Sequence, residues 1–276
     1  MLPLMQNKRG LVMGVANQNS IAWGIAKTLH AHGAELAFTY QGEALGKRVK
    51  PLAESIGSDL VIPCDVEDIA SVDAAFAKLD AVWGGDPARN TLDFLVHAIG
   101  FSDKNELKGL YADTSRENFS RTMVISCFSF TEATKRAAER MPHGGSIVTL
   151  TYGGSMRIMP NYNVMGVAKA ALEASVRYLA GDYGPRGIRV NALSPGPVRT
   201  LAGAGISDAR AMLSWQRANA PLRKSVTLEE IGGAALYYLS DLSGGVTGDV
   251  HHVDAGYHIT SMPVLEGLRA ADQGEA

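Results

Sequence analysis

The chain has 276 residues, of which 46% are hydrophobic and 20% are charged, and its formal net charge is −2 at pH 7. This composition is typical of a globular protein and argues against general binding to nucleic acid or to an anionic membrane surface. We expect one domain over residues 1–276, ending in a polar tail at about 263–276.

Cysteine usage and the N-terminal residues indicate a cytoplasmic protein. The two cysteines, Cys64 and Cys127, fit a reducing compartment better than a disulfide framework. The first ten residues turn polar after the fifth, unlike a signal peptide, and no apolar run approaches the ~20 residues of a membrane-spanning helix. We therefore expect cytoplasmic localisation and no membrane span.

Strand-like and helix-like segments alternate along the chain. The predicted strands lie at residues 11–13, 35–39, 60–63, 92–98, 146–151, 188–193 and 250–253. The predicted helices lie at residues 21–32, 43–56 (interrupted at Pro51), 71–83, 115–141, 163–180 and 228–239. Residues 201–220 are rich in Ala, Gly and Ser and predict a helical substrate lid, taken as about 198–220. The alternation predicts an α/β fold, with a seven-stranded parallel sheet and helices on both of its faces.

A glycine loop separates the first predicted strand from the first predicted helix. It reads Gly14-x5-Ser20-Ile21-x2-Gly24. A dinucleotide pyrophosphate binds at this place in such folds, because the helix N-terminus offers free N–H groups. The loop is not G-x-G-x-x-G, so a plain strand-to-helix turn with Ser20 as N-cap stays open as the alternative.

The residues after the second and third predicted strands are candidates for binding the adenosine half of the nucleotide. Gln41 stands where an acidic residue favours NAD and an arginine favours NADP, and it is neither. We expect NADH, because Gln41 offers no charge to a 2′-phosphate, while Lys47 and Arg48 keep NADPH as the alternative. Asp65 and Val66 are candidates for bracketing the adenine, and a helix-starting aspartate is the competing interpretation.

The most informative stretch is Tyr152-x9-Tyr162-x6-Lys169, which follows the fifth predicted strand. Tyr162 and Lys169 are about two helical turns apart and so share a helix face. A phenol beside a lysine can donate a proton to negative charge that develops on a substrate oxygen, and the cation together with ribose hydroxyls can lower the phenol pKa. Ordinary short-chain dehydrogenases have their lysine four residues after the tyrosine, where this chain has Gly166.

Several motifs in order resemble those of the bacterial NADH-dependent enoyl-acyl-carrier-protein reductases of type II fatty acid synthesis. They are G-x5-S-I-x2-G, FTYQ, CDV, H-x-I-G-F, PNYNVMGVAKA and SPGPVRTLA, and the likeness runs roughly from residue 8 to 261. The resemblance implies a Rossmann-type doubly wound fold, a homotetramer, and reduction of trans-2-enoyl thioesters on acyl carrier protein with NADH.

The resemblance also implies roles for individual residues. Tyr162 would bind the thioester carbonyl oxygen, Lys169 the nicotinamide ribose, and Tyr152 would line the pocket for substrate placement or proton delivery. Ser102 would lie near the acyl group. The implied nucleotide-binding residues are Gly14, Ser20, Ile21, Gln41, Asp65, Val66, Ile99, Lys169, Val198, Arg199, Thr200, Leu201 and Ala202.

Other interpretations remain at this stage. One is a carbonyl or alcohol dehydrogenase of the same fold, although Gly166 replaces the lysine that such enzymes use. Another is a catalytically silent nucleotide-binding protein. The cluster of His251, His252, Asp254 and His258 is not expected to bind a metal, because neighbouring strand residues point to opposite faces.

Overall fold

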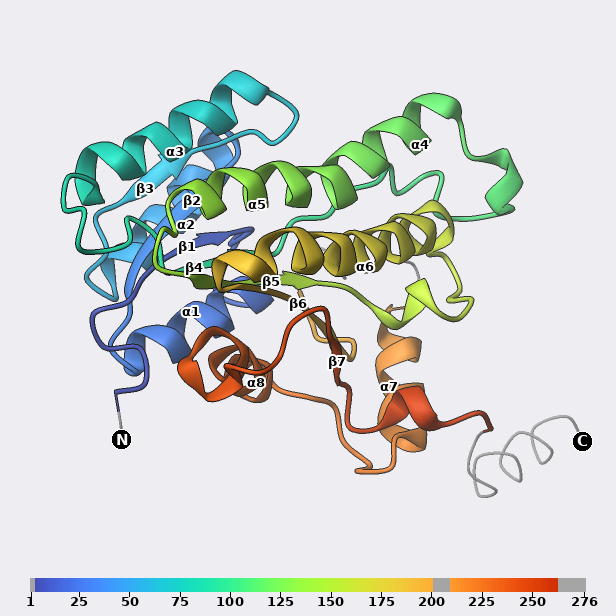
Figure 1. Cartoon of the computed structure of the whole chain (residues 1–276). Coiled ribbons are helices and arrows are strands. Elements are labelled where there is room, and N and C mark those ends of the chain that lie inside the picture. Colours follow the sequence, from blue (N-terminus) through green and yellow to red (C-terminus); the bar gives the residue numbers. More distant parts are fainter. Residues whose placement is uncertain (1–2, 201–208, 263–276) are drawn as a thin grey trace, which may run out of the picture.

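The computed structural model describes residues 3–200 and 209–262. Seven parallel strands form one sheet in the order β3-β2-β1-β4-β5-β6-β7 (Figure 1). The strands are β1 (Arg9–Met13), β2 (Glu35–Tyr40), β3 (Val61–Pro63), β4 (Phe94–His97), β5 (Gly145–Leu150), β6 (Ile188–Pro195) and β7 (Val250–Val253). The predicted parallel α/β sheet is confirmed. The strand order reverses between β1 and β4, and ligands of such sheets bind at that crevice.

Helices cover both faces of this sheet (Figure 1). They are α1 (Ile21–Ala31), α2 (Gly42–Glu54), α3 (Ile69–Trp83), α4 (Arg116–Met123), α5 (Ser129–Glu139), α6 (Asn163–Tyr183), α7 (Ala209–Asn219) and α8 (Leu228–Leu239). One core packs α3, α5 and α6 on the sheet, and the other packs α1, α2 and α8. Strand side chains alternate between them: Leu11 and Met13 enter the first core and Val12 the second. No helix in the described part of the chain is long and apolar enough to cross a bilayer.

Two helix predictions are wrong in detail. α2 is not interrupted at Pro51 but continues to Glu54, because Val49 and Ala53 on either side of the proline are buried and hold the last turn against the core. The long helix predicted over residues 115–141 is divided into α4 and α5 by a π-helical turn at Val124–Phe128. Of the predicted lid, α7 is described, whereas residues 201–208 and the predicted tail lie outside the described residues.

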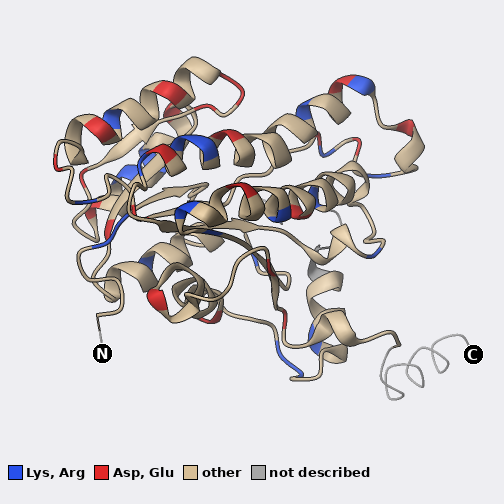
Figure 2. Cartoon of the chain, viewed as in Figure 1, with Lys and Arg blue, Asp and Glu red and all other residues tan. Residues whose placement is uncertain are grey.

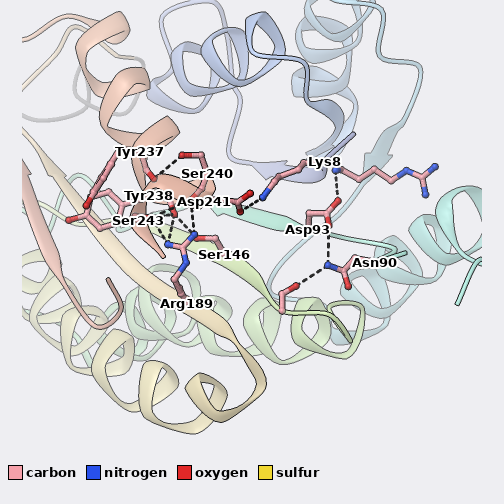
Figure 3. Close-up of polar contacts among 12 residues, drawn as sticks. Lys8, Asn90, Asp93, Ser146, Arg189, Tyr237, Tyr238, Ser240, Asp241 and Ser243 are labelled. Atoms are coloured by element: carbon pink, nitrogen blue, oxygen red, sulfur yellow. Dashed lines mark hydrogen bonds and ion pairs between the residues drawn. The ribbon is translucent and has the colours of Figure 1, made fainter. Parts of the chain in front are cut away.

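A partly buried arginine fastens the end of α8 to the sheet (Figure 3). Arg189 of β6 donates to the Tyr238 carbonyl at 2.8 Å and to the Ser240 carbonyl at 2.9 Å. Ser146 of β5 donates to the same Tyr238 carbonyl at 2.7 Å. A cation at a helix C-terminus satisfies carbonyls that lack a partner within the helix, so the C-terminal end of α8 is fixed against β5 and β6.

α8 in turn positions α1, the helix that begins at the glycine loop. Two glycines let the helices approach closely. A Cβ atom on Gly24 would lie 2.7 Å from the Leu228 Cβ atom, and one on Gly232 would lie 2.2 Å from the Thr28 hydroxyl oxygen. The position of the α1 N-terminus therefore depends on the absence of side chains at this contact.

Adjacent glycines of α8 provide a test of this packing. Gly232→Ala should lower the free energy of unfolding by about 1–3 kcal/mol, because the new methyl group overlaps α1. Gly233→Ala should raise it by up to about 1 kcal/mol, because alanine favours a helix and a Cβ atom there meets no atom within 4 Å. Urea unfolding of both variants measures the difference. Equal stabilities would show that α1 and α8 are not closely packed.

Candidate active site

A cavity of about 380 Å³ lies at the carboxyl edge of the sheet, where the loops after β1, β4, β5 and β6 meet the start of α6. Many of the predicted site residues line it. They are Gly14, Ser20, Ile21, Ile99, Ser102, Tyr152, Tyr162, Lys169, Val198 and Thr200. The fold thus brings together residues that are up to 186 positions apart, 14 to 200, because parallel strands end at one edge.

The remaining predicted residues lie elsewhere. Gln41 and Asp65 meet at the ends of β2 and β3, where the Gln41 amide donates to the Asp65 carboxylate at 3.0 Å. Val66 packs in the core on the α3 side of the sheet. Arg199 is exposed and does not line the cavity, and Leu201 and Ala202 lie outside the described residues.

The glycine loop is shaped by one glycine and one serine. Gly14 has φ +101°, and a Cβ atom there would lie 2.0 Å from the Ala98 carbonyl oxygen, so only glycine fits. The Ser20 hydroxyl oxygen accepts from the Ala16 and Asn17 amides at 3.0 and 3.1 Å. Ser20 stands at the N-cap position but makes no side-chain capping bond to α1; its hydroxyl folds the loop instead. The first N–H groups of α1 therefore have no cap from this serine.

Tyr152 follows β5, and Tyr162 immediately precedes α6. Their rings meet edge to face, with centroids 5.2 Å apart. The Lys169 ammonium donates to the Leu150 carbonyl at 2.8 Å, its one hydrogen bond among the described residues. Two of its three N–H groups are thus left for a partner in the cavity. The Tyr162 hydroxyl likewise has no hydrogen-bond partner in residues 3–200 and 209–262.

The backbone around Tyr162 is unusual. Asn161 and Asn163, on either side, have φ of 57° and 30°, in the left-handed region that asparagine tolerates better than most residues. A Cβ atom on Gly154 would lie 2.4 Å from the Tyr162 ring. A Cβ atom on Gly166 would lie 2.7 Å from the Gly154 carbonyl oxygen. The turn after Tyr152 thus contacts α6 at Gly166, four residues after Tyr162, and no side chain fits at that position.

Burial determines the protonation states of Tyr152, Tyr162 and Lys169. It raises the pKa of Tyr152 to about 12. Burial, with smaller effects of Tyr152 and Glu173, also raises the pKa of Tyr162 well above its ordinary value. Burial lowers the pKa of Lys169 to about 8. Desolvation determines the direction of the Tyr162 pKa change, and Tyr162 is a neutral phenol at pH 7.

Residues that no sequence motif identified hold the cavity wall in place. Ser126, in the π-helical turn, accepts from the Phe101 amide and donates to the Phe101 carbonyl, both at 2.9 Å. The Ser102 hydroxyl accepts from Thr122 at 2.9 Å and from the Asn118 amide at 3.2 Å. Ser102 is therefore engaged with α4. No periodicity identifies these residues, because their contacts join segments distant in sequence.

The turn after β7 borders a smaller neighbouring cavity of about 60 Å³, which Tyr152 also lines. Gln216 of α7 is buried and donates to the Asp254 carbonyl at 3.1 Å. The Asp254 carboxylate accepts from the His258 amide at 2.7 Å and contacts the His258 ring at 3.0 Å. In the described part of the chain, no three His, Cys, Asp or Glu side chains are arranged to hold a metal ion. Asp254 shapes the turn.

The glycine at the fourth position offers a test of the geometry. Gly166→Ala should destabilise the protein by about 1–3 kcal/mol, because the added carbon collides with the Gly154 carbonyl oxygen. Gly181→Ala, on the same helix, is the control, since a Cβ atom there meets nothing within 4 Å. Thermal unfolding followed by circular dichroism compares them. A Gly166→Ala variant as stable as the control would contradict the close contact.

Comparison with known proteins places this chain in a family. The family model described as "Enoyl-(Acyl carrier protein) reductase" matches residues 14–258. The enoyl-acyl-carrier-protein reductase (NADH) 2 of Rhizobium meliloti (strain 1021) is 75% identical over 269 residues, 98% of each chain. A crystal structure of FabI from Candidatus Liberibacter asiaticus has a TM-score of 0.92 and 59% identity, covering 96% of this chain and 100% of that one. An enoyl-acyl-carrier-protein reductase from Anaplasma phagocytophilum in complex with NAD has a TM-score of 0.90 and 56% identity, covering 96% and 99%. The chain belongs to the enoyl-acyl-carrier-protein reductase family.

Proposed function

We propose that this protein reduces the carbon–carbon double bond of trans-2-enoyl-acyl-carrier-protein thioesters with hydride from NADH. The observation that carries the proposal is the contact between Gly154 and Gly166. It leaves no room for a lysine four residues after Tyr162 and so supports Lys169, which lines the same cavity, in the lysine role. The family of the chain and the names of its relatives support the same reaction.

The residues present fit a nicotinamide dinucleotide. Gly14 lets the loop approach Ala98, and the first turn of α1 offers a pyrophosphate N–H groups and the positive end of a helix dipole. The two remaining donors of Lys169 suit vicinal hydroxyls of the nicotinamide ribose. Gln41 and Asp65 are placed at the strand ends where the adenosine half is bound in such folds. NADH, when bound, supplies the hydride.

Tyr162 has the properties that the reaction needs. When a β-carbon of an enoyl thioester accepts hydride, negative charge moves to the thioester oxygen, which becomes an enolate. Tyr162 is neutral and has no competing acceptor among the described residues, so it can donate its hydrogen bond to that oxygen. A proton must then be added at the α-carbon, and we propose Tyr152, whose ring contacts that of Tyr162, for substrate placement or delivery of this proton.

We propose acyl carrier protein as partner, a homotetramer and a cytoplasmic location. Exposed apolar side chains on α4, the π-helical turn and α6 suit contact with a second copy; they are Phe119, Val124, Phe128, Val167 and Tyr178. Charges of both signs alternate along α3 and α5 in Figure 2, which gives no support to nucleic acid as a partner.

The first test removes the Tyr162 hydroxyl. Tyr162→Phe should lower kcat on a trans-2-enoyl thioester about 10²–10³-fold, the usual effect of losing one donor to a developing oxyanion. The dissociation constant for NADH should change less than about threefold, because the ring is retained. Stopped-flow absorbance and NADH fluorescence measure the two quantities. Unchanged turnover would remove Tyr162 from the mechanism, and faster turnover of ketones than of enoyl thioesters would favour a carbonyl reductase.

The second test concerns the nucleotide. kcat/KM should be at least about tenfold higher with NADH than with NADPH, because Gln41 offers no charge-assisted hydrogen bond to a 2′-phosphate. Gln41→Arg should reduce that ratio, and Gln41→Glu should keep it. A wild-type preference for NADPH would assign the phosphate to Lys47 or Arg48, which are exposed on α2.

A further inference from the structure

A buried carboxylate beside the site has no part in the proposed chemistry. Glu173 lies on α6, one helical turn after Lys169, and is only 9% exposed. Its Oε1 atom accepts from the Thr151 hydroxyl at 2.5 Å. Thr151 lines the cavity and directly precedes Tyr152. Burying a carboxylate is costly, so a carboxylate retained here calls for a compensating role.

Glu173 and Lys169 hold consecutive residues at the end of β5. The Lys169 ammonium donates to the Leu150 carbonyl at 2.8 Å, and Thr151 donates to Glu173. The strand end that leads to Tyr152 is therefore attached at two points to the helix that begins after Tyr162. The edge-to-face contact of the two tyrosines depends on how this strand end and helix are placed.

The two charges also act on each other. Residues four apart on a helix are neighbours, and both side chains are buried, where charges are weakly screened. Burial lowers the pKa of Lys169, and Cys127 and Glu173 oppose that change. Glu173 also contributes to the raised pKa of Tyr162. One carboxylate thus favours the protonated forms of both residues.

Other titratable groups around this pair are neutral at pH 7. Burial lowers the pKa of His97, which faces Lys169 from β4, to about 3. Burial raises the pKa of the Cys127 thiol, which faces Lys169 from the π-helical turn. Burial lowers the pKa of His252, which faces Glu173 from β7. Tyr162 and Tyr152 are neutral phenols. Glu173 is thus the acidic side chain of this set, one turn from Lys169 on α6.

We propose that Glu173 is a positioning residue of the active site, which keeps Lys169 as an ammonium and, through Thr151, holds the end of β5 on α6. The inference rests on the proposed function, in which Lys169 binds the nicotinamide ribose. It gives Glu173 a role through Lys169 and Thr151 without contact with substrate or cofactor.

The sign of the expected pH effect follows from the charge. The Lys169 pKa of about 8 is lowered from its ordinary value, so the ammonium is present below pH 8 and is lost as the pH rises through that value. Removing the negative charge of Glu173 lowers this pKa further. NADH binding that needs the ammonium should then weaken at a lower pH than in the wild type.

The test is the NADH dissociation constant from pH 6 to 10, followed by fluorescence, in the full chain and its variants. Glu173→Gln keeps the shape and the acceptor for Thr151 but removes the charge. It should move the alkaline loss of affinity down by roughly one pH unit, with affinity at pH 6 within about threefold of wild type. The matched control Thr151→Val keeps the charge and removes the hydrogen bond. It should leave the alkaline loss in place and lower the melting temperature.

The outcomes separate the two proposals. If Glu173→Gln binds NADH with the same pH dependence as the wild type, the Glu173 charge has no role. The same conclusion follows if Thr151→Val moves the alkaline loss of affinity as far as Glu173→Gln does. Neither result bears on the proposed function. If the wild type binds no NADH at any pH, the proposed function fails, and this inference fails with it. Should Glu173→Gln not fold, Glu173→Asp, which draws the charge back by one methylene, should move the alkaline loss in the same direction. An unmoved loss in that folded variant overturns the inference.

Discussion

The contact of the Gly154 carbonyl with α6 at Gly166 is the constraint on which the rest of the site depends. Backbone meets backbone there, because neither residue has a side chain, and a Cβ atom on Gly166 would lie 2.7 Å from the carbonyl oxygen. The turn after β5 is therefore drawn onto the helix, and Tyr152 is brought against Tyr162. In the proposed site, the lysine comes from a position further along α6, which Lys169 occupies.

Close packing of this kind excludes water, and the absence of water determines the pKa values of Tyr162 and Lys169. A phenol that is buried resists losing its proton, so Tyr162 is a donor and not a base. A buried ammonium is costly; Lys169 donates to the Leu150 carbonyl, and Glu173, one turn away, opposes the lowering of its pKa by burial. The proposed reaction needs a neutral donor at the enolate oxygen and a cation at the nicotinamide ribose. Desolvation keeps the Tyr162 phenol neutral, and it makes the Lys169 ammonium depend on its neighbours.

The parallel sheet brings the site residues together at one edge, and close contacts at glycines determine the positions of the elements around the cavity. Gly14 allows the first loop to approach Ala98, and Gly24 and Gly232 bring α1 against α8. At the far side, a Cβ atom on Gly196 would lie 2.3 Å from the Gln216 amide nitrogen, whose side chain bonds to Asp254. In each case a missing side chain sets a distance between elements that are far apart in sequence, so one added methyl group would act on the placement of the cavity walls.

The sequence by itself determined the order and type of the elements. The predicted bounds of α8 and β7 agree with the structure, since helical and strand periodicity are local properties. Spacing also indicated that Tyr162 and Lys169 belong together, and the motifs indicated the family. Tertiary structure alone decided the rest. The π-helical turn contains Ser126, which bonds to the distant Phe101, and α2 continues past Pro51 because Val49 and Ala53 are buried. The direction of the Tyr162 pKa change depends on burial, and the burial of a side chain is set by contacts with residues that no local pattern identifies.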